Sequence, residues 1–118
     1  FINIGLVFSK DVYYCSDIKS VGFNVDQGYE VGMFQENRFK AVIDFQNRKF
    51  ISDKLNFLKS ITICSFSDFT KNLHCLSAVG GSISINQNSL KYARSSHNVH
   101  DGNFNEDYTV SYGNCEIF

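Results

Sequence analysis

Few side chains in this chain are suited to acid–base chemistry. Cleavage of an RNA phosphodiester needs a base for the 2′-hydroxyl, an acid for the leaving oxygen and a cation for the phosphate. Glu, His and Arg on adjacent strands of one sheet face usually fill these roles. The strand-like segment 55–64 carries Lys59 as its only charge, and the segment 82–86 carries none. We therefore expect no catalytic residues on these strands.

A relocated catalytic set is the alternative to inactivity. Glu30 or Glu36 would then act with Arg94 and His97. Cleavage of RNA that is abolished by His97→Ala would support this alternative over an inactive protein.

The histidines do not indicate a metal site. His97 and His100 lie in "SSHNVHDGN", where Asn, Asp and Gly favour a loop over the helix that an i, i+3 ligand pair would need. His74 lies beside Cys75, which we expect to be oxidised. We expect neither a metal nor another cofactor.

The charges are distributed unevenly, although the formal net charge is only −1. Residues 11–36 are rich in acids, residues 38–59 are rich in bases, and residues 98–118 contain four acids and no base. If RNA is a partner, we expect phosphate contacts from the basic segment and the strand near residue 94. The candidate contact residues for RNA or another partner are Arg38, Lys40, Arg48, Lys49, Lys59, Lys91, Arg94 and His97.

Four cysteines lie in this small chain without CxxC or Cys/His metal spacing, which is typical of two disulfides and an oxidising export route. Three pairings are possible, and we favour Cys15–Cys115 with Cys64–Cys75. The inner pair would enclose a polar-aromatic loop, and the outer pair would join the two ends of the domain. No apolar run reaches the ~20 residues of a membrane helix, so no membrane partner is expected.

The periodicity predicts one helix followed by strands. Ser16 or Asp17 would cap a helix over residues 15–28, Ile18 and Val21 recur at helical spacing, and Gly28 would end it. Strands are expected at 2–8, 38–45, 49–52, 55–64, 75–79, 82–86, 90–96 and 108–112, with hairpin turns at 47–49 and 86–89. The expected fold is a single α+β domain over residues 1–118, with the N-terminal helix packed on an antiparallel sheet.

The motif Tyr13-Tyr14-Cys15, the helix expected after it, and a cysteine close to the end in "GNCEIF" resemble the RNase-like secreted effectors of powdery mildew fungi. In that group a Y/F/W-x-C motif marks the start of a fold similar to fungal guanyl-specific ribonucleases. The resemblance covers residues 12–118, and the absence of proline departs from the group. It implies that Tyr13 packs near the outer disulfide, whereas alternation exposes Tyr14.

The resemblance also implies a pseudoenzyme, because the positions of the ribonuclease Glu and Arg fall on "NFLKSITI" and "GGSISI", and that of the His falls near Ser96. The expected function is that of a catalytically inactive, secreted avirulence or virulence protein delivered to the cytoplasm of plant host cells. It would act as a monomer that binds host protein, an intracellular immune receptor included, or RNA. A third alternative is a secreted toxin of unrelated lineage, which the absence of a helix on a ribonuclease-like sheet would favour.

Overall fold

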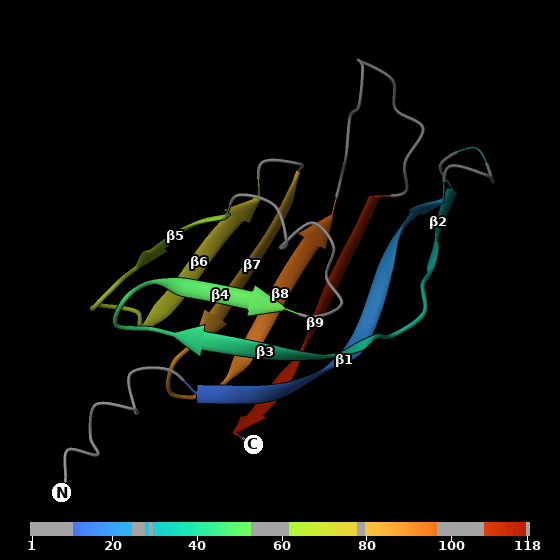
Figure 1. Ribbon diagram of the computed structural model, residues 1–118. Coiled ribbons are helices and arrows are strands. Elements are labelled where there is room, and N and C mark those ends of the chain that lie inside the picture. Colours follow the sequence, from blue (N-terminus) through green and yellow to red (C-terminus); the bar gives the residue numbers. More distant parts are fainter. Residues whose placement is uncertain are drawn as a thin grey trace, which may run out of the picture.

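The structure is a computed structural model, and it describes residues 11–24, 28, 30–52, 62–77, 80–96 and 108–117. These residues form β-strands joined by turns and short connections, with no helix among them (Figure 1). The strands are β1 (Asp11–Asn24), β2 (Glu30–Met33), β3 (Arg38–Asp44), β4 (Lys49–Ser52), β5 (Thr62–Phe66), β6 (Asn72–Ser77), β7 (Gly81–Asn86), β8 (Lys91–Ser96) and β9 (Tyr108–Ile117).

All nine strands belong to one antiparallel sheet. Their order is β4-β3-β1-β9-β8-β7-β6-β5, and β2 pairs with β1 beside β3. The sheet curves until its end strands β4 and β5 come into contact, so that β3 and β4 lie across from β6–β8 (Figure 1). The described fold is therefore a nearly closed, barrel-like sheet.

The expected α+β class is wrong, and with it the N-terminal helix of a ribonuclease-like scaffold. Residues 15–24 of the expected helix belong to β1, which pairs with β3 and β9 along most of its length. The expected strand at 2–8 lies outside the described residues. β2 was not expected at all. β3, β4, β7 and β8 begin and end within one residue of their expected positions, β6 begins three residues early, and β9 continues past residue 112 to Ile117. β5 overlaps the end of the strand expected at 55–64, of which residues 55–61 lie outside the described residues.

A β-bulge explains why this strand has the periodicity of a helix. The register of β1 against β9 shifts between Asp17 and Lys19, which adds one residue to β1. Ile18 and Val21, three residues apart, therefore lie on the same outer side, and Asp17 and Ser20 are both buried. In a regular strand this spacing would separate the two members of each pair onto opposite faces.

The core lies on the concave side of the sheet. It is built mainly from alternate residues of β1, β3, β4 and β6–β9, and the partly buried Cys64 and Phe66 of β5 pack against it. The rings of Tyr13 and Phe45, of Phe39 and Tyr92, and of Phe45 and Phe66 meet edge to face, with centroids 6.3, 5.5 and 6.2 Å apart. Tyr13 is buried as expected, and Tyr14 is exposed on the opposite face.

Both predicted disulfides are present, Cys15–Cys115 and Cys64–Cys75. Each joins directly opposed residues of neighbouring antiparallel strands, β1 with β9 and β5 with β6. The outer bridge therefore fastens the first described strand to the last.

The expected hairpin turns are found after β3 and β7, but asparagine does not adopt the positive φ there. Arg48 and Leu90 do so, with φ of 57° and 59°. The Asn86 side chain instead accepts hydrogen bonds from the backbone N–H groups of Asn88 and Ser89. In the first turn, the Asp44 carboxylate accepts hydrogen bonds from the backbone N–H and the side-chain amide of Asn47.

Removal of the outer bridge by Cys15→Ser with Cys115→Ser should lower the free energy of unfolding by up to about 4–5 kcal/mol, because a long loop is no longer closed in the unfolded chain. The two cysteines are 100 residues apart, against 11 for Cys64 and Cys75. The matched variant Cys64→Ser with Cys75→Ser should therefore lose less, under about 3 kcal/mol. Denaturant titration of the three proteins measures both losses, and equal losses would contradict the loop-closure argument.

Candidate functional site

A buried ion pair lies at the bulge of β1. The Asp17 carboxylate accepts hydrogen bonds from Arg94 Nη2 at 2.5 Å, from Arg94 Nε at 3.2 Å and from the Tyr92 hydroxyl at 2.6 Å. The backbone N–H of Asn37 donates a further bond to it at 2.9 Å. The side chains of Arg94 and Asp17 are 6% and 0% exposed, so the pair is withdrawn from solvent.

Two features of the local sequence allow the ion pair to form, one on β1 and one on β9. Asp17 follows the buried Tyr13 and Cys15 at alternate positions of β1 and therefore faces inside, where β8 presents Tyr92 and Arg94 two residues apart on the same face. Gly113 of β9 lies opposite, and a Cβ atom there would come within 2.0 Å of the Ser16 carbonyl oxygen and 2.6 Å of the Tyr92 hydroxyl. Only glycine allows β1, β8 and β9 to approach this closely.

The hydrogen bonds that the Asp17 carboxylate accepts control its protonation. Burial alone would raise the pKa of Asp17, but the bonds from Arg94, Tyr92 and Asn37 outweigh it and lower that pKa below its ordinary value. Burial, followed by donation to the Asp17 carboxylate, raises the pKa of Tyr92. The Asp17 carboxyl group is therefore ionised at neutral pH, and it accepts several hydrogen bonds. This state suits a structural role better than proton transfer.

The candidate cationic residues fall into separate groups. Arg38 of β3 and Lys91 of β8 lie in one row on the outer face of the sheet, with Ser16 of β1 and Asn114 of β9 between them. Lys40 lies in a neighbouring row, where Tyr14 pairs with both Lys40 and Glu116. Arg48 and Lys49 lie in the β3–β4 hairpin. Arg94 is occupied by Asp17 inside the sheet.

Lys59 and His97 lie outside the described residues. Glu30 and Glu36 are exposed, whereas Arg94 is buried, so these three do not form a common catalytic site.

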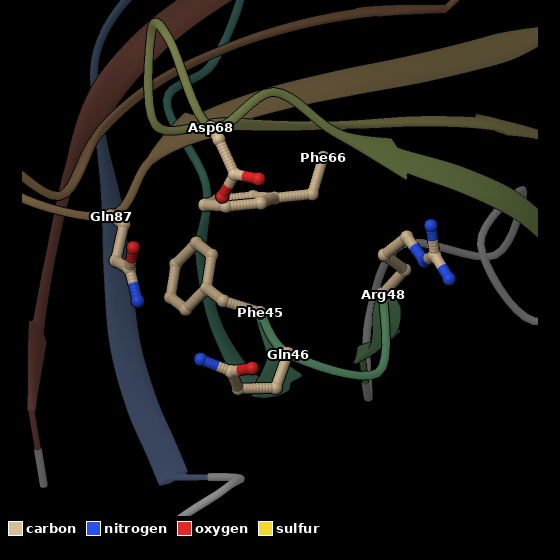
Figure 2. A pocket seen from close by; sticks show the side chains of 6 residues that line it. All are labelled: Phe45, Gln46, Arg48, Phe66, Asp68 and Gln87. Atoms are coloured by element: carbon tan, nitrogen blue, oxygen red, sulfur yellow. The ribbon is translucent and has the colours of Figure 1, made fainter.

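One hollow, of about 230 Å³, opens among the hairpin turns after β3, β5 and β7 (Figure 2). Phe45 and Phe66 lie beside each other in it, and Asp68 also lines it. Arg48 extends away from the two rings, and Gln46 and Gln87 supply amide groups. Its lining contains one carboxylate and no histidine or cysteine, so these residues offer no acid–base pair.

The most distinctive surface is apolar. We define the apolar face as Val21, Phe23, Val31, Met33, Val110 and Tyr112, all of them on β1, β2 and β9. Val21 pairs with Met33 on one side and Val110 on the other, and Phe23 pairs with Val31. Except for the half-buried Val21, every member is exposed, up to 73% for Val31. A second hollow, of about 320 Å³, lies along this face and is lined chiefly by apolar atoms.

Sequence reasoning missed this face, although a signal was present. "Val21-Gly22-Phe23" and "Val31-Gly32-Met33" mirror each other about position 27, next to Gly28, which is the pattern of a hairpin with apolar side chains on one side. It also missed the ion pair, because Asp17 was assigned to a helix cap.

Within the described ranges, no three His, Cys, Asp or Glu side chains are grouped as ligands of a metal ion. The same part of the chain contains no helix with the length and hydropathy that a membrane crossing requires. No family model, curated protein or solved structure matches the chain. The resemblance to fungal effectors thus rests on the quoted sequence features, and one of these, the helix, is not formed.

Substitution of Asp17 by Asn should destabilise the fold by about 3–5 kcal/mol, because it leaves the buried Arg94 charge without a counter-ion. Asp17→Leu combined with Arg94→Met should cost less than the sum of the two single changes, since both charges are then removed. A double-mutant cycle by chemical denaturation measures the coupling. Additive losses would mean that the two side chains do not stabilise each other.

Acid should weaken the protein through the same carboxyl group. The pKa of Asp17 is lower in the folded protein than its ordinary value of 3.8, so its contribution is complete above that value and is lost as pH falls through the folded pKa. Stability measured between about pH 6 and pH 2 should fall more steeply in the parent protein than in Asp17→Asn. Identical pH profiles of the two proteins would contradict the lowered pKa.

Proposed function

We propose that this protein is an exported, non-enzymatic binding protein that recognises a protein partner through the apolar face. The observation that carries the proposal is the contrast between inside and outside. The buried Asp17 and Arg94 neutralise each other, whereas contiguous large apolar side chains of β1, β2 and β9 are exposed to water. Such patches are typical of protein interaction sites in soluble domains.

Two further observations support a protein partner over RNA. The apolar face joins three strands through direct cross-strand pairs, whereas the uncharged Ser16 and Asn114 separate Arg38 from Lys91. Arg94, a candidate phosphate contact, is already bonded to Asp17. RNA binding favours a cationic groove with stacking aromatics, but one of the two hollows described above is lined by a single cation and the other by none.

The proposal keeps part of the function that the resemblance implied. Two disulfides are compatible with an exported protein, and a binding role agrees with an effector that acts on host protein in the plant cytoplasm, an immune receptor included. The ribonuclease-like scaffold is set aside, because β1 replaces its helix. The absence of that helix favours a lineage unrelated to ribonucleases.

Val110→Lys combined with Tyr112→Lys should strongly reduce the capture of a protein partner from plant extract, because it places two charges on the apolar face. Ile63→Lys is the matched control, since Ile63 is also an exposed apolar residue but lies on β5. Because the changed residues are exposed, all variants should melt close to the parent protein.

Quantitative mass spectrometry of the retained proteins decides the outcome. Retention that is lost in the double variant and kept in the control supports the proposal. Equal retention by the two variants would contradict it. Retention that disappears after nuclease treatment or falls steeply with salt would identify RNA as the partner instead.

A further inference from the structure

The strand β2 lies at an edge of the described sheet. β2 pairs with β1 on one side, and no described strand lies on its other side (Figure 1). Its side chains Val31 and Met33 are 73% and 64% exposed and form one border of the apolar face. An open strand edge offers backbone groups to an incoming strand.

The hydrogen-bond pattern shows which backbone groups are available. The Phe34 N–H donates to the Ser20 carbonyl oxygen at 2.8 Å, one step beyond the pairing of Val21 with Met33. In an antiparallel ladder, hydrogen-bonded and non-hydrogen-bonded pairs alternate. Gly32 and Glu30 therefore direct their backbone groups toward β1. The N–H and C=O groups of Val31 and Met33 point away from β1.

We propose that this edge accepts an extended segment of a partner protein as an added β-strand. This inference rests on the proposed function and specifies how the partner docks. The two N–H and two C=O groups of Val31 and Met33 are spaced as in any ladder, so an incoming strand can bond to all four. Alternate side chains of that strand then continue the apolar face beyond Val31 and Met33.

The charges select the kind of segment. Glu30 and Glu36 are exposed at the two ends of the stretch 30–36, which contains no lysine or arginine. A partner strand with apolar residues at alternate positions and Lys or Arg at its ends complements this stretch. A second copy of this chain would instead place two acidic stretches side by side, which disfavours self-pairing.

The test uses two synthetic peptides, KVTVTVK and its acidic counterpart EVTVTVE, titrated into the isotope-labelled, disulfide-intact protein. The basic peptide should shift the amide signals of Val31 and Met33 most, and the acidic peptide should bind several-fold more weakly. Val31→Pro should abolish binding, because it removes an N–H group that points away from β1 and leaves the β1 pairing intact. Val31→Ala is the control, because it shortens the side chain but keeps the N–H group.

Amide hydrogen exchange of the parent protein gives an independent measurement if Val31→Pro does not fold. The amides of Val31 and Met33 should exchange much faster than those of Gly32 and Phe34. Equal protection of all four amides would show that the outer edge of β2 is not open, and the proposal would be wrong. If protection of Val31 and Met33 rises with protein concentration together with dimer formation, a second copy is the occupant and the proposal is wrong.

The remaining outcomes separate this inference from the proposed function. No amide shift with either peptide, equal affinity for both, or unchanged binding by Val31→Pro would overturn strand addition alone, provided that Val110→Lys with Tyr112→Lys still loses the captured partner. If the double variant keeps the partner, the proposed function itself is wrong.

Discussion

The buried carboxylate of Asp17 is the constraint on which the arrangement of the strands depends. It holds Tyr92 and Arg94 of β8 from within β1, and it also binds the backbone N–H of Asn37 in the connection between β2 and β3. An ionised group this deeply buried is tolerated only when its acceptor sites are filled. The geometry of β1, β8 and the β2–β3 connection must therefore be mutually consistent around one side chain.

The bulge that follows Asp17 shapes the outside of the molecule. The extra residue in β1 resets the alternation, so Val21 and Phe23 of β1 face outward beside Val31 and Met33 of β2. Where β2 ends, the chain passes through residues 34–37 and resumes pairing with β1 as β3. The bulge directly after the buried Asp17 thus decides which side chains of β1 form the apolar face beside β2.

The chemistry of the molecule is divided between its two sides. Inside, Ser20 and Ser111 share a hydrogen bond of 2.7 Å near the satisfied ion pair, and the core beyond them is apolar and closed by the outer disulfide. Outside, the apolar face is exposed, and no described strand pairs with the outer edge of β2. The ion pair, the apolar core and the disulfide hold the strands beneath this surface together, and this support is the physical basis of the function we propose.

Local signals in the sequence were sufficient for the disulfides, the turn positions and most strands. Cysteine number and spacing favoured the observed pairing, and short runs with apolar residues, separated by Asn, Asp, Gly and Ser, marked β3, β4, β7 and β8. These features depend on residues close together in the chain, or on covalent chemistry.

Tertiary structure alone decided the state of residues 11–24 and the roles of Asp17, Tyr92 and Arg94. Ile18 and Val21 have the same spacing in a helix and in a bulged strand, and only pairing with β3 and β9 distinguishes the two. Arg94 had the sequence context of a surface cation, yet its partner lies 77 residues away. Such a contact exists only after β1, β9 and β8 have paired, because side-chain burial and long-range pairing are properties of the assembled sheet and not of any local segment.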